Sequence, residues 1–267
     1  MMKDYRICRV VSSTHEAKNF IVFFKMRIKK EFPLFPIYCD KLKHNWLVIS
    51  GCGKKSISSS IVYLHNCSQS KSNAIWINYG VGFKKEKVSN IYFIDEIIEQ
   101  EYKDKVYPST IDTGLFKRSS ICTVKNYRYN LSIFQDTDCY QFFKTASKIA
   151  SYEFIIIIKI SVNKEKLNNN EVVQKLVKKH FDDILKFENT FKKLSKLISL
   201  NLKYPKSYFE LNSLFHFTTY QKHQLKTLLK KWYNINSQNI MEKISDKRNA
   251  DYVIKFLRKE TEKGIIH

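Results

Sequence analysis

Short apolar runs alternate with helical stripes along the first two hundred residues of the chain. The runs are rich in β-branched residues, as buried strands are, and they occupy residues 7–12, 46–50, 74–78 and 154–160. Shorter strand candidates follow at 91–94 and 119–124. Between the runs, apolar residues recur every three or four positions, as on one face of a helix, at 16–28, 139–150 and 171–200. This alternation predicts a mainly parallel sheet with helical crossovers.

The apolar run at 154–160 ends in Ser161, Val162 and Asn163. An almost unbroken β-branched run indicates a strand that is buried on both faces, as in parallel sheets covered by helices. Ligands of such sheets bind beyond the carboxyl ends of the strands. The three residues are therefore candidates for a site, although the valine among them can neither give nor take a proton.

Two other buried strands run into glycine-rich segments. Gly51 and Gly53 follow the strand at 46–50, and Gly80, Val81 and Gly82 follow the strand at 74–78. Glycine permits a positive φ and lets a ligand approach the backbone N–H groups, and the helix start after Gly53 suits a phosphate or sugar oxygen. One such turn alone is better explained as an ordinary tight connection, but two turns on neighbouring strands favour a small anion or a sugar.

Acidic residues stand at two predicted junctions between a strand and a helix. Glu16 opens the first helix, and Asp136 and Asp138 precede the helix at 139–150. Each acid taken singly is explained by the helix dipole or by N-capping. Their shared placement at one sheet edge favours acid–base chemistry by separated carboxylates.

The chain carries a formal net charge of +22, from 47 basic and 25 acidic residues. Such a charge is typical of proteins that bind nucleic acid or anionic membranes. However, 40 of the basic residues are lysine and 7 are arginine, the usual reader of bases, and the lysines are spread along the whole chain. Compositional bias is therefore the better interpretation, and nucleic-acid binding is kept as a weaker hypothesis.

Targeting and cofactor motifs are not evident. No apolar run approaches the roughly 18 residues of a membrane helix, and no long apolar segment follows the first residues as in a signal peptide. The six cysteines form no CxxC pair, so neither a metal site nor a disulfide framework is expected. We expect a cytoplasmic protein with reduced thiols and no membrane partner.

The last part of the chain has a different character. Tyr204 and Pro205 interrupt the long helical pattern, and two further helical stripes follow at 220–232 and 240–257. We expect two domains, an α/β domain over residues 1–204 and a helical C-terminal extension over residues 205–267.

Four segments taken together resemble the superfamily of nucleoside phosphorylases and 5′-methylthioadenosine/S-adenosylhomocysteine nucleosidases. They are residues 10–17, the turn 50–54, the segment 78–82, and 136–138 with the following helix and strand to residue 163. The resemblance covers about residues 7–200. It implies a three-layer α/β sandwich around a mixed, mostly parallel sheet, with the C-terminal helices outside it. It also implies a homo-oligomer, a dimer as first choice.

The resemblance further implies cleavage of the N-glycosidic bond of a purine nucleoside, by water or with phosphate as co-substrate, and no cofactor. In that scheme Glu16 positions or activates the water, and Asp138 stands where the family has a ribose-binding glutamate. The substrate would be lined by residues of both glycine segments and of the later junctions, namely Gly51, Gly53, Gly80, Val81, Gly82, Thr137, Ser161, Val162 and Asn163.

Val162 departs from the family pattern, because it stands where the resemblance expects the aspartate that protonates the leaving base. Loss of a general acid costs about 10²–10⁴ in rate. Two hypotheses follow. One is a nucleosidase or phosphorylase with weakened activity, and the other is a non-catalytic descendant that binds a nucleoside or a partner protein.

Overall fold

The computed structural model describes residues 6–29, 33–71, 73–85, 89–101, 103–109, 111, 113–129, 132–167, 169–201, 206–235, 240–244 and 249–263. The chain forms two compact units, Met1–Lys196 and Leu197–His267, which are described separately below. The predicted boundary between residues 204 and 205 lies outside the described residues.

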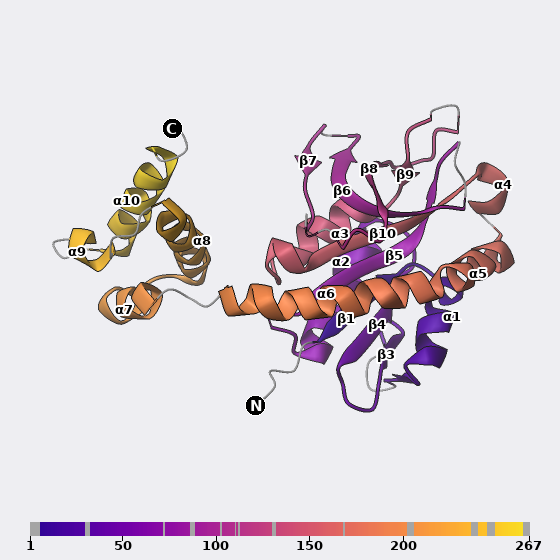
Figure 1. The fold of residues 1–267 in the computed structure, drawn as a ribbon, viewed down its shortest axis with the longest axis horizontal. Helices are drawn as coiled ribbons and strands as arrows, with labels where there is room; N and C mark the ends of the chain where they lie inside the picture. The colour runs from indigo at the N-terminus through magenta and orange to yellow at the C-terminus, as the bar shows by residue number, and fades with distance from the viewer. Residues whose placement is uncertain are drawn as a thin grey trace. The chain divides into compact units, whose positions relative to one another are not determined.

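Four parallel strands form the centre of the sheet in the first unit (Figure 1). Strand β1 (Ile7–Val11) lies between β4 (Asn45–Ile49) and β5 (Ile75–Phe83), and β5 pairs on its other side with β10 (Ile155–Val162). The shorter β2 (Arg27–Ile28) and β3 (Ile37–Cys39) extend the sheet antiparallel beyond β4. The central strands are the apolar runs of the sequence, and their buried side chains are packed on both faces.

Helices cover both faces of the sheet. One face carries α2 (Lys54–Ser68) and α3 (Cys139–Ala146), whose apolar residues share one core with alternate residues of β1, β5 and β10. The other face carries α1 (Thr14–Phe23), α5 (Asn170–Lys179) and α6 (Phe181–Asn201), of which α6 crosses in front of the strands in Figure 1. A 3₁₀ turn (Tyr152–Phe154) precedes β10, and a short α4 (Lys164–Leu167) follows this strand.

The predicted three layers and the mixed sheet are present, but part of the sheet closes on itself, which a sandwich with one open sheet does not do. Strand β10 also pairs antiparallel with β6 (Ile91–Glu99), and the chain of pairings continues through β8 (Lys117–Thr123) and β9 (Gln135–Asp136) back to β5. These five strands therefore close into a ring, beside which β7 (Lys105–Val106) pairs with β6. Among the described strands, five pairings are parallel and five are antiparallel.

The predicted turn around Gly80 and Gly82 is wrong, because both residues lie inside strand β5. Neither has a positive φ. A Cβ at Gly82 would lie 2.7 Å from Cε2 of Phe134 and 2.9 Å from the Gln135 carbonyl oxygen. Gly82 thus lets β9 approach β5 closely, and this contact is part of the ring closure.

The second unit is helical. It contains α7 (Lys206–Leu214), α8 (Thr219–Ile235), α9 (Ile240–Ile244) and α10 (Ala250–Lys263), which account for the helical stripes predicted at 220–232 and 240–257. Leu225, Leu229 and Trp232 of α8 pack with Val253 and Leu257 of α10 in its buried core. Among the helices of the described residues, none has the length and apolar character needed to cross a bilayer.

Candidate active site

The first element of the site is the carboxylate of Glu16, which is held at the amino end of α1. Ser13 is the N-cap residue, and its hydroxyl accepts a hydrogen bond from the Glu16 N–H (3.3 Å). In return Glu16 Oε2 accepts from Ser12 N (2.8 Å), Ser12 Oγ (3.0 Å) and Ser13 N (3.1 Å). This capping box needs a side-chain oxygen at the third helical position, and the Glu16 carboxylate supplies it. The box also fixes one carboxylate oxygen, in a side chain that is buried.

The second oxygen of Glu16 is aimed at strand β5. Glu16 Oε1 accepts from the backbone N–H of Val81 at 3.2 Å. A Cβ on Gly80 would lie only 2.9 Å from this oxygen. Gly80 is therefore needed for its small size, and two of the three predicted residues of β5, Gly80 and Val81, contact the predicted acid.

Replacing Gly80 with alanine should reduce activity more than stability. Because both oxygens of Glu16 are already held, the added methyl must displace the carboxylate, and misplacing a reacting group by about 1 Å costs on the order of 10² in rate. The test compares Gly80→Ala with the wild type in two measurements, the steady-state rate of nucleoside cleavage and the temperature of thermal unfolding. Equal loss of rate and of folded protein would contradict the interpretation.

Lys159 of β10 joins the two other acids of the site. Its Nζ lies 3.0 Å from Asp138 Oδ1 and 3.2 Å from Asp136 Oδ2, and all three side chains are buried. The same ammonium nitrogen would lie 3.4 Å from a Cβ on Gly80, so it borders the Glu16 carboxylate as well. Sequence reasoning did not single out Lys159. The sequence does contain an indication of its role, because Lys159 is a charged residue inside the apolar run 154–160 and a buried lysine needs an acidic partner.

Asp136 and Asp138 both precede the first residue of α3, and their side chains differ in the hydrogen bonds that they accept. Asp136 Oδ1 accepts from Thr123 Oγ1 (2.9 Å), and Asp136 Oδ2 accepts from the Cys139 N–H (2.9 Å). Asp138 occupies the N-cap position of α3, but its side chain makes no capping bond there.

The protonation of the three groups follows from these contacts. Burial raises the pKa of Asp138 to about 7, with the neighbouring Asp136 charge adding to the rise and Lys159 opposing it. Burial acts in the same direction on Asp136, but Lys159 and its hydrogen-bond donors hold the pKa of Asp136 below its ordinary value. Burial lowers the pKa of Lys159, yet the facing carboxylates raise it well above its ordinary value, so the ammonium stays charged.

One group of side chains has atoms spaced closely enough for a metal ion. An oxygen of Asp136, an oxygen of Asp138 and the sulfur of Cys139 lie within 4.8 Å of one another. The Lys159 ammonium already contacts both carboxylates and supplies the positive charge there. These side chains are therefore not arranged as metal ligands.

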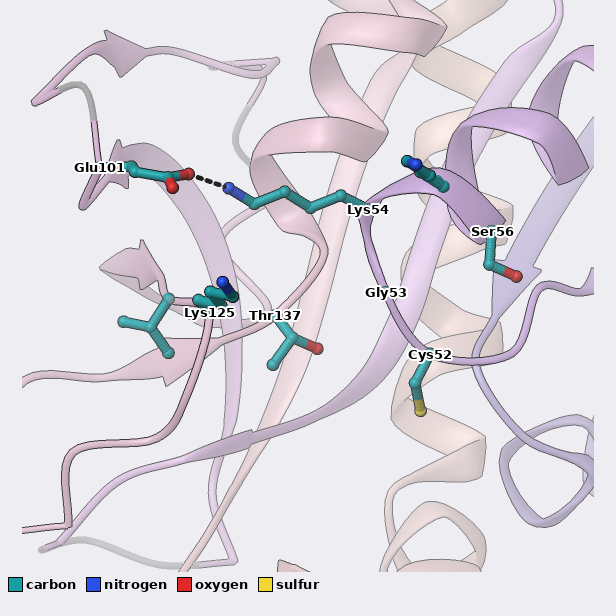
Figure 2. A pocket seen from close by; sticks show the side chains of 9 residues that line it. Cys52, Gly53, Lys54, Ser56, Glu101, Lys125 and Thr137 are labelled. Carbon is teal, nitrogen blue, oxygen red and sulfur yellow. Dashed lines mark hydrogen bonds and ion pairs between the residues drawn. The ribbon is translucent and has the colours of Figure 1, made fainter.

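A cavity of about 530 Å³ includes Thr137, the residue between Asp136 and Asp138, in its wall (Figure 2). It is lined by the turn before α2, the first turn of that helix and the later junctions, namely Cys52, Gly53, Lys54, Lys55, Ser56, Glu101, Val124, Lys125 and Thr137. Figure 2 shows Lys54 extended toward Glu101, and its Nζ lies 2.8 Å from Glu101 Oε2 and 2.8 Å from Glu99 Oε1.

The glycines of this turn have the conformations that the sequence predicted for them. Gly51 has a φ of +71° and Gly53 a φ of +104°, and Gly53 is the N-cap residue of α2. Between them, Cys52 links the cavity to the acids. Burial raises the pKa of the Cys52 thiol, and the charges of Asp138 and Glu16 raise it further. The charges of both carboxylates therefore act on a side chain of the cavity wall.

Comparison with solved structures identifies this arrangement of elements. A methylthioadenosine nucleosidase (MTAN) variant from Chlamydia trachomatis superposes with a TM-score of 0.55 at 16% identity, over 70% of this chain and 99% of that one. The MTA/SAH nucleosidase of Streptococcus pneumoniae, in complex with 8-aminoadenine, gives 0.55 at 11% identity, over 70% and 99%. Futalosine hydrolase of Helicobacter pylori gives 0.54 at 10% identity, over 71% and 98%. The chain has the fold of the nucleoside phosphorylase and nucleosidase superfamily.

The resemblance stated from the sequence is thereby confirmed at the level of the nucleosidase fold. No protein-family model matches the sequence, and no curated protein matches it either. The solved nucleosidases are covered almost completely by this chain, while about three tenths of this chain lies outside each superposition.

Within the nucleosidase fold, the predicted residues fall into two groups. Asp138 contacts Lys159, and Glu16 contacts the Val81 N–H and lies against Gly80. Gly51 and Gly53 belong to the turn before α2, and Gly53 and Thr137 line the cavity. The remaining residues lie elsewhere, and they are Gly82, Ser161, Val162 and Asn163.

Val162 lies on the opposite face of β10 from Lys159, because successive side chains of a strand alternate between faces. It is fully buried with Ile160, Val173 and Val177 in the apolar cluster under α5. Its neighbours have structural contacts. Ser161 Oγ accepts from the Asn90 N–H (3.2 Å), and Asn163 Oδ1 accepts from the Lys166 N–H (3.2 Å).

Proposed function

We propose that the chain hydrolyses the N-glycosidic bond of a purine nucleoside at this site. The observation that carries the proposal is the placement of two buried acids near Lys159: Asp138 contacts its ammonium at 3.0 Å, and the Glu16 carboxylate lies across Gly80 from it. A cavity of about 530 Å³ reaches this region through Thr137, which lies between Asp136 and Asp138 in the sequence. Solved structures with this fold include nucleosidases that act on nucleosides of adenine, and the cavity lies at the sheet edge where ligands of α/β proteins bind.

The two acids suit the two halves of such a reaction. The electron pair of the C1′–N bond passes to the base, which takes a proton from the Asp138 carboxyl group. Water adds to the resulting ribosyl cation, and its proton passes to the Glu16 carboxylate. A raised pKa of about 7 lets Asp138 carry a proton at neutral pH, and the held oxygens of Glu16 fix its orientation.

Charge favours water over phosphate as the nucleophile. Glu16, Asp136 and Asp138 are three acids around the single ammonium of Lys159, so the group is negative overall even with Asp138 protonated. The cavity wall carries Lys54, Lys55 and Lys125, so a phosphate dianion would be repelled only where it meets the buried carboxylates, whereas water would not be repelled there.

Release of free base from a panel of purine nucleosides tests the proposal. The purified full-length protein should release base from at least one member, such as methylthioadenosine, adenosine or inosine, at a rate that added phosphate does not raise. Chromatography of the products against a Glu16→Gln control excludes a contaminating nucleosidase. Strict dependence on phosphate would replace hydrolysis by phosphorolysis, and no release under either condition would reject both.

A non-catalytic nucleoside-binding role is the second candidate, and one observation favours it. The position expected to hold the proton-donating aspartate is Val162, which lies in an apolar cluster. Calorimetry with methylthioadenosine and adenine distinguishes the two roles. Binding of the intact nucleoside without release of base would support the second candidate.

A further inference from the structure

We propose that Asp136, held ionised by its hydrogen-bond donors, is a positioning residue that leaves the one proton of the aspartate pair on Asp138, and that Lys159 supplies the counter-charge of the pair. Asp138 is then the acid of the site. Its use in catalysis rests on the proposed function above, but the location of the proton does not, and it can be measured without a substrate.

The numbers of hydrogen-bond donors around the two carboxylates differ. Asp136 faces the hydroxyl of Thr123, the N–H of Cys139 and the ammonium of Lys159, at 2.9, 2.9 and 3.2 Å. Three donors stabilise the ionised form of a carboxylate. Asp138 is bonded to Lys159 at 3.0 Å, and its side chain forms no capping bond with α3. Of two adjacent buried acids, the one with fewer donors holds the proton.

Lys159 makes this arrangement possible because it contacts both acids at once. Two carboxylates this close in a buried site cannot both ionise without a counter-charge. The lysine side chain is itself buried within β10, so its ammonium has little access to water. It is held as a fixed cation in contact with both carboxylates, so the pair balances this charge with one ionised and one protonated carboxyl group.

The other ionisable groups near the pair do not compete for this proton at neutral pH. Burial raises the pKa of the thiols of Cys52 and Cys139 and of the Tyr127 hydroxyl, so all three keep their protons. Glu16 accepts four hydrogen bonds, from Ser12, Ser13 and Val81. The exchangeable proton is therefore assigned to the aspartate pair, which titrates as one unit.

The test is a pH titration of the full-length protein labelled with ¹³C at the aspartate carboxyl carbons, followed by NMR. Asp136→Asn and Asp138→Asn assign the two signals. We expect the Asp138 signal to titrate near pH 7 and the Asp136 signal to remain that of a carboxylate down to pH 4. An Asp138 signal that stays ionised from pH 5 to 9, or a titrating Asp136, would overturn the proposal.

Two further variants test the positioning role. Lys159→Met removes the shared cation and should raise the midpoint of the pair by about 1–3 pH units. Thr123→Val removes one donor from Asp136 and should move part of the proton onto Asp136, so it serves where Lys159→Met does not fold. Lys125→Met, in the exposed wall of the cavity, should leave the midpoint within about 0.3 pH units because solvent screens that charge. Unchanged midpoints in both buried variants would reject the positioning role.

The outcomes separate this inference from the proposed function. A proton found on Asp138 with no release of base from any nucleoside would keep the inference and reject the enzyme. Release of base by a protein in which Asp138 stays ionised throughout would keep the proposed enzyme and reject the inference about the proton.

Discussion

Replacing Glu188 with alanine is expected to lower the free energy of unfolding by about 3–5 kcal/mol, because it leaves a buried arginine without its counter-charge. Arg9 of β1 is 0% exposed, and its Nε donates to Glu188 Oε1 at 2.7 Å while Nη2 contacts Glu188 Oε2. Tyr79 donates to the same Oε1 at 2.9 Å, and Asn45 accepts from Arg9 Nη2 at 3.1 Å. Glu188 thus connects α6 directly to β1 and β5 of the sheet.

Denaturant unfolding of the full-length protein, followed by tryptophan fluorescence, measures this loss. Glu171→Ala, an exposed acid of α5, is the matched control and should change stability by less than about 0.5 kcal/mol. The double variant Arg9→Met with Glu188→Met should recover most of the loss, since an apolar pair can replace a buried ion pair. A loss below about 1 kcal/mol in Glu188→Ala would show that water or another acid solvates Arg9.

Arg9 and Lys159 show what the sequence can and cannot predict about the interior. Both are charged residues inside apolar strands, which the hydrophobic pattern identified correctly as buried. A buried charge must have a partner, so the existence of acids near them follows from the sequence. Which acids they meet does not follow. Glu188 and Asp138 come from distant segments, and only the packing of α6 and α3 brings them to these strands.

The glycines of β5 show a second limit. A Gly-x-Gly segment after an apolar run predicts a turn, because glycine most often serves where φ is positive. At Gly51 and Gly53 that prediction is confirmed. At Gly80 and Gly82 the same residue type is used for its missing Cβ, beside a carboxylate and beside a neighbouring strand. Sequence alone does not distinguish the two uses, since both need only the absence of a side chain.

Strand β10 shows a third limit. Alternation places Lys159 and Ser161 on one face and Ile160 and Val162 on the other. The pattern could not say which face bears the charged groups, because both faces are buried. The position of Val162 at the strand tip therefore predicted proximity to a ligand, whereas its face placed it among the apolar residues under α5.

Glu16→Gln should lower the rate of base release by about 10²–10⁴ without unfolding the protein. The amide oxygen can still accept the hydrogen bonds of the capping box from Ser12 and Ser13, so α1 keeps its start. The amide cannot take a proton from water, and its NH₂ group meets the Val81 N–H as a second donor. The loss should therefore appear mainly in kcat, because the carboxylate acts on the nucleophile and not on binding of the base.

The dependence of the rate on pH distinguishes the role of Glu16 from the role of Asp138. If Asp138 supplies the proton, the wild-type rate falls as the pH rises through about 7, since the acid form is lost above that pH. Glu16→Gln should keep this falling limb at a lower plateau, whereas Asp138→Asn should lose the limb altogether. A Glu16→Gln profile that matches the wild type in height would exclude Glu16 from the reaction. A falling limb that persists in Asp138→Asn would assign the acid to another group.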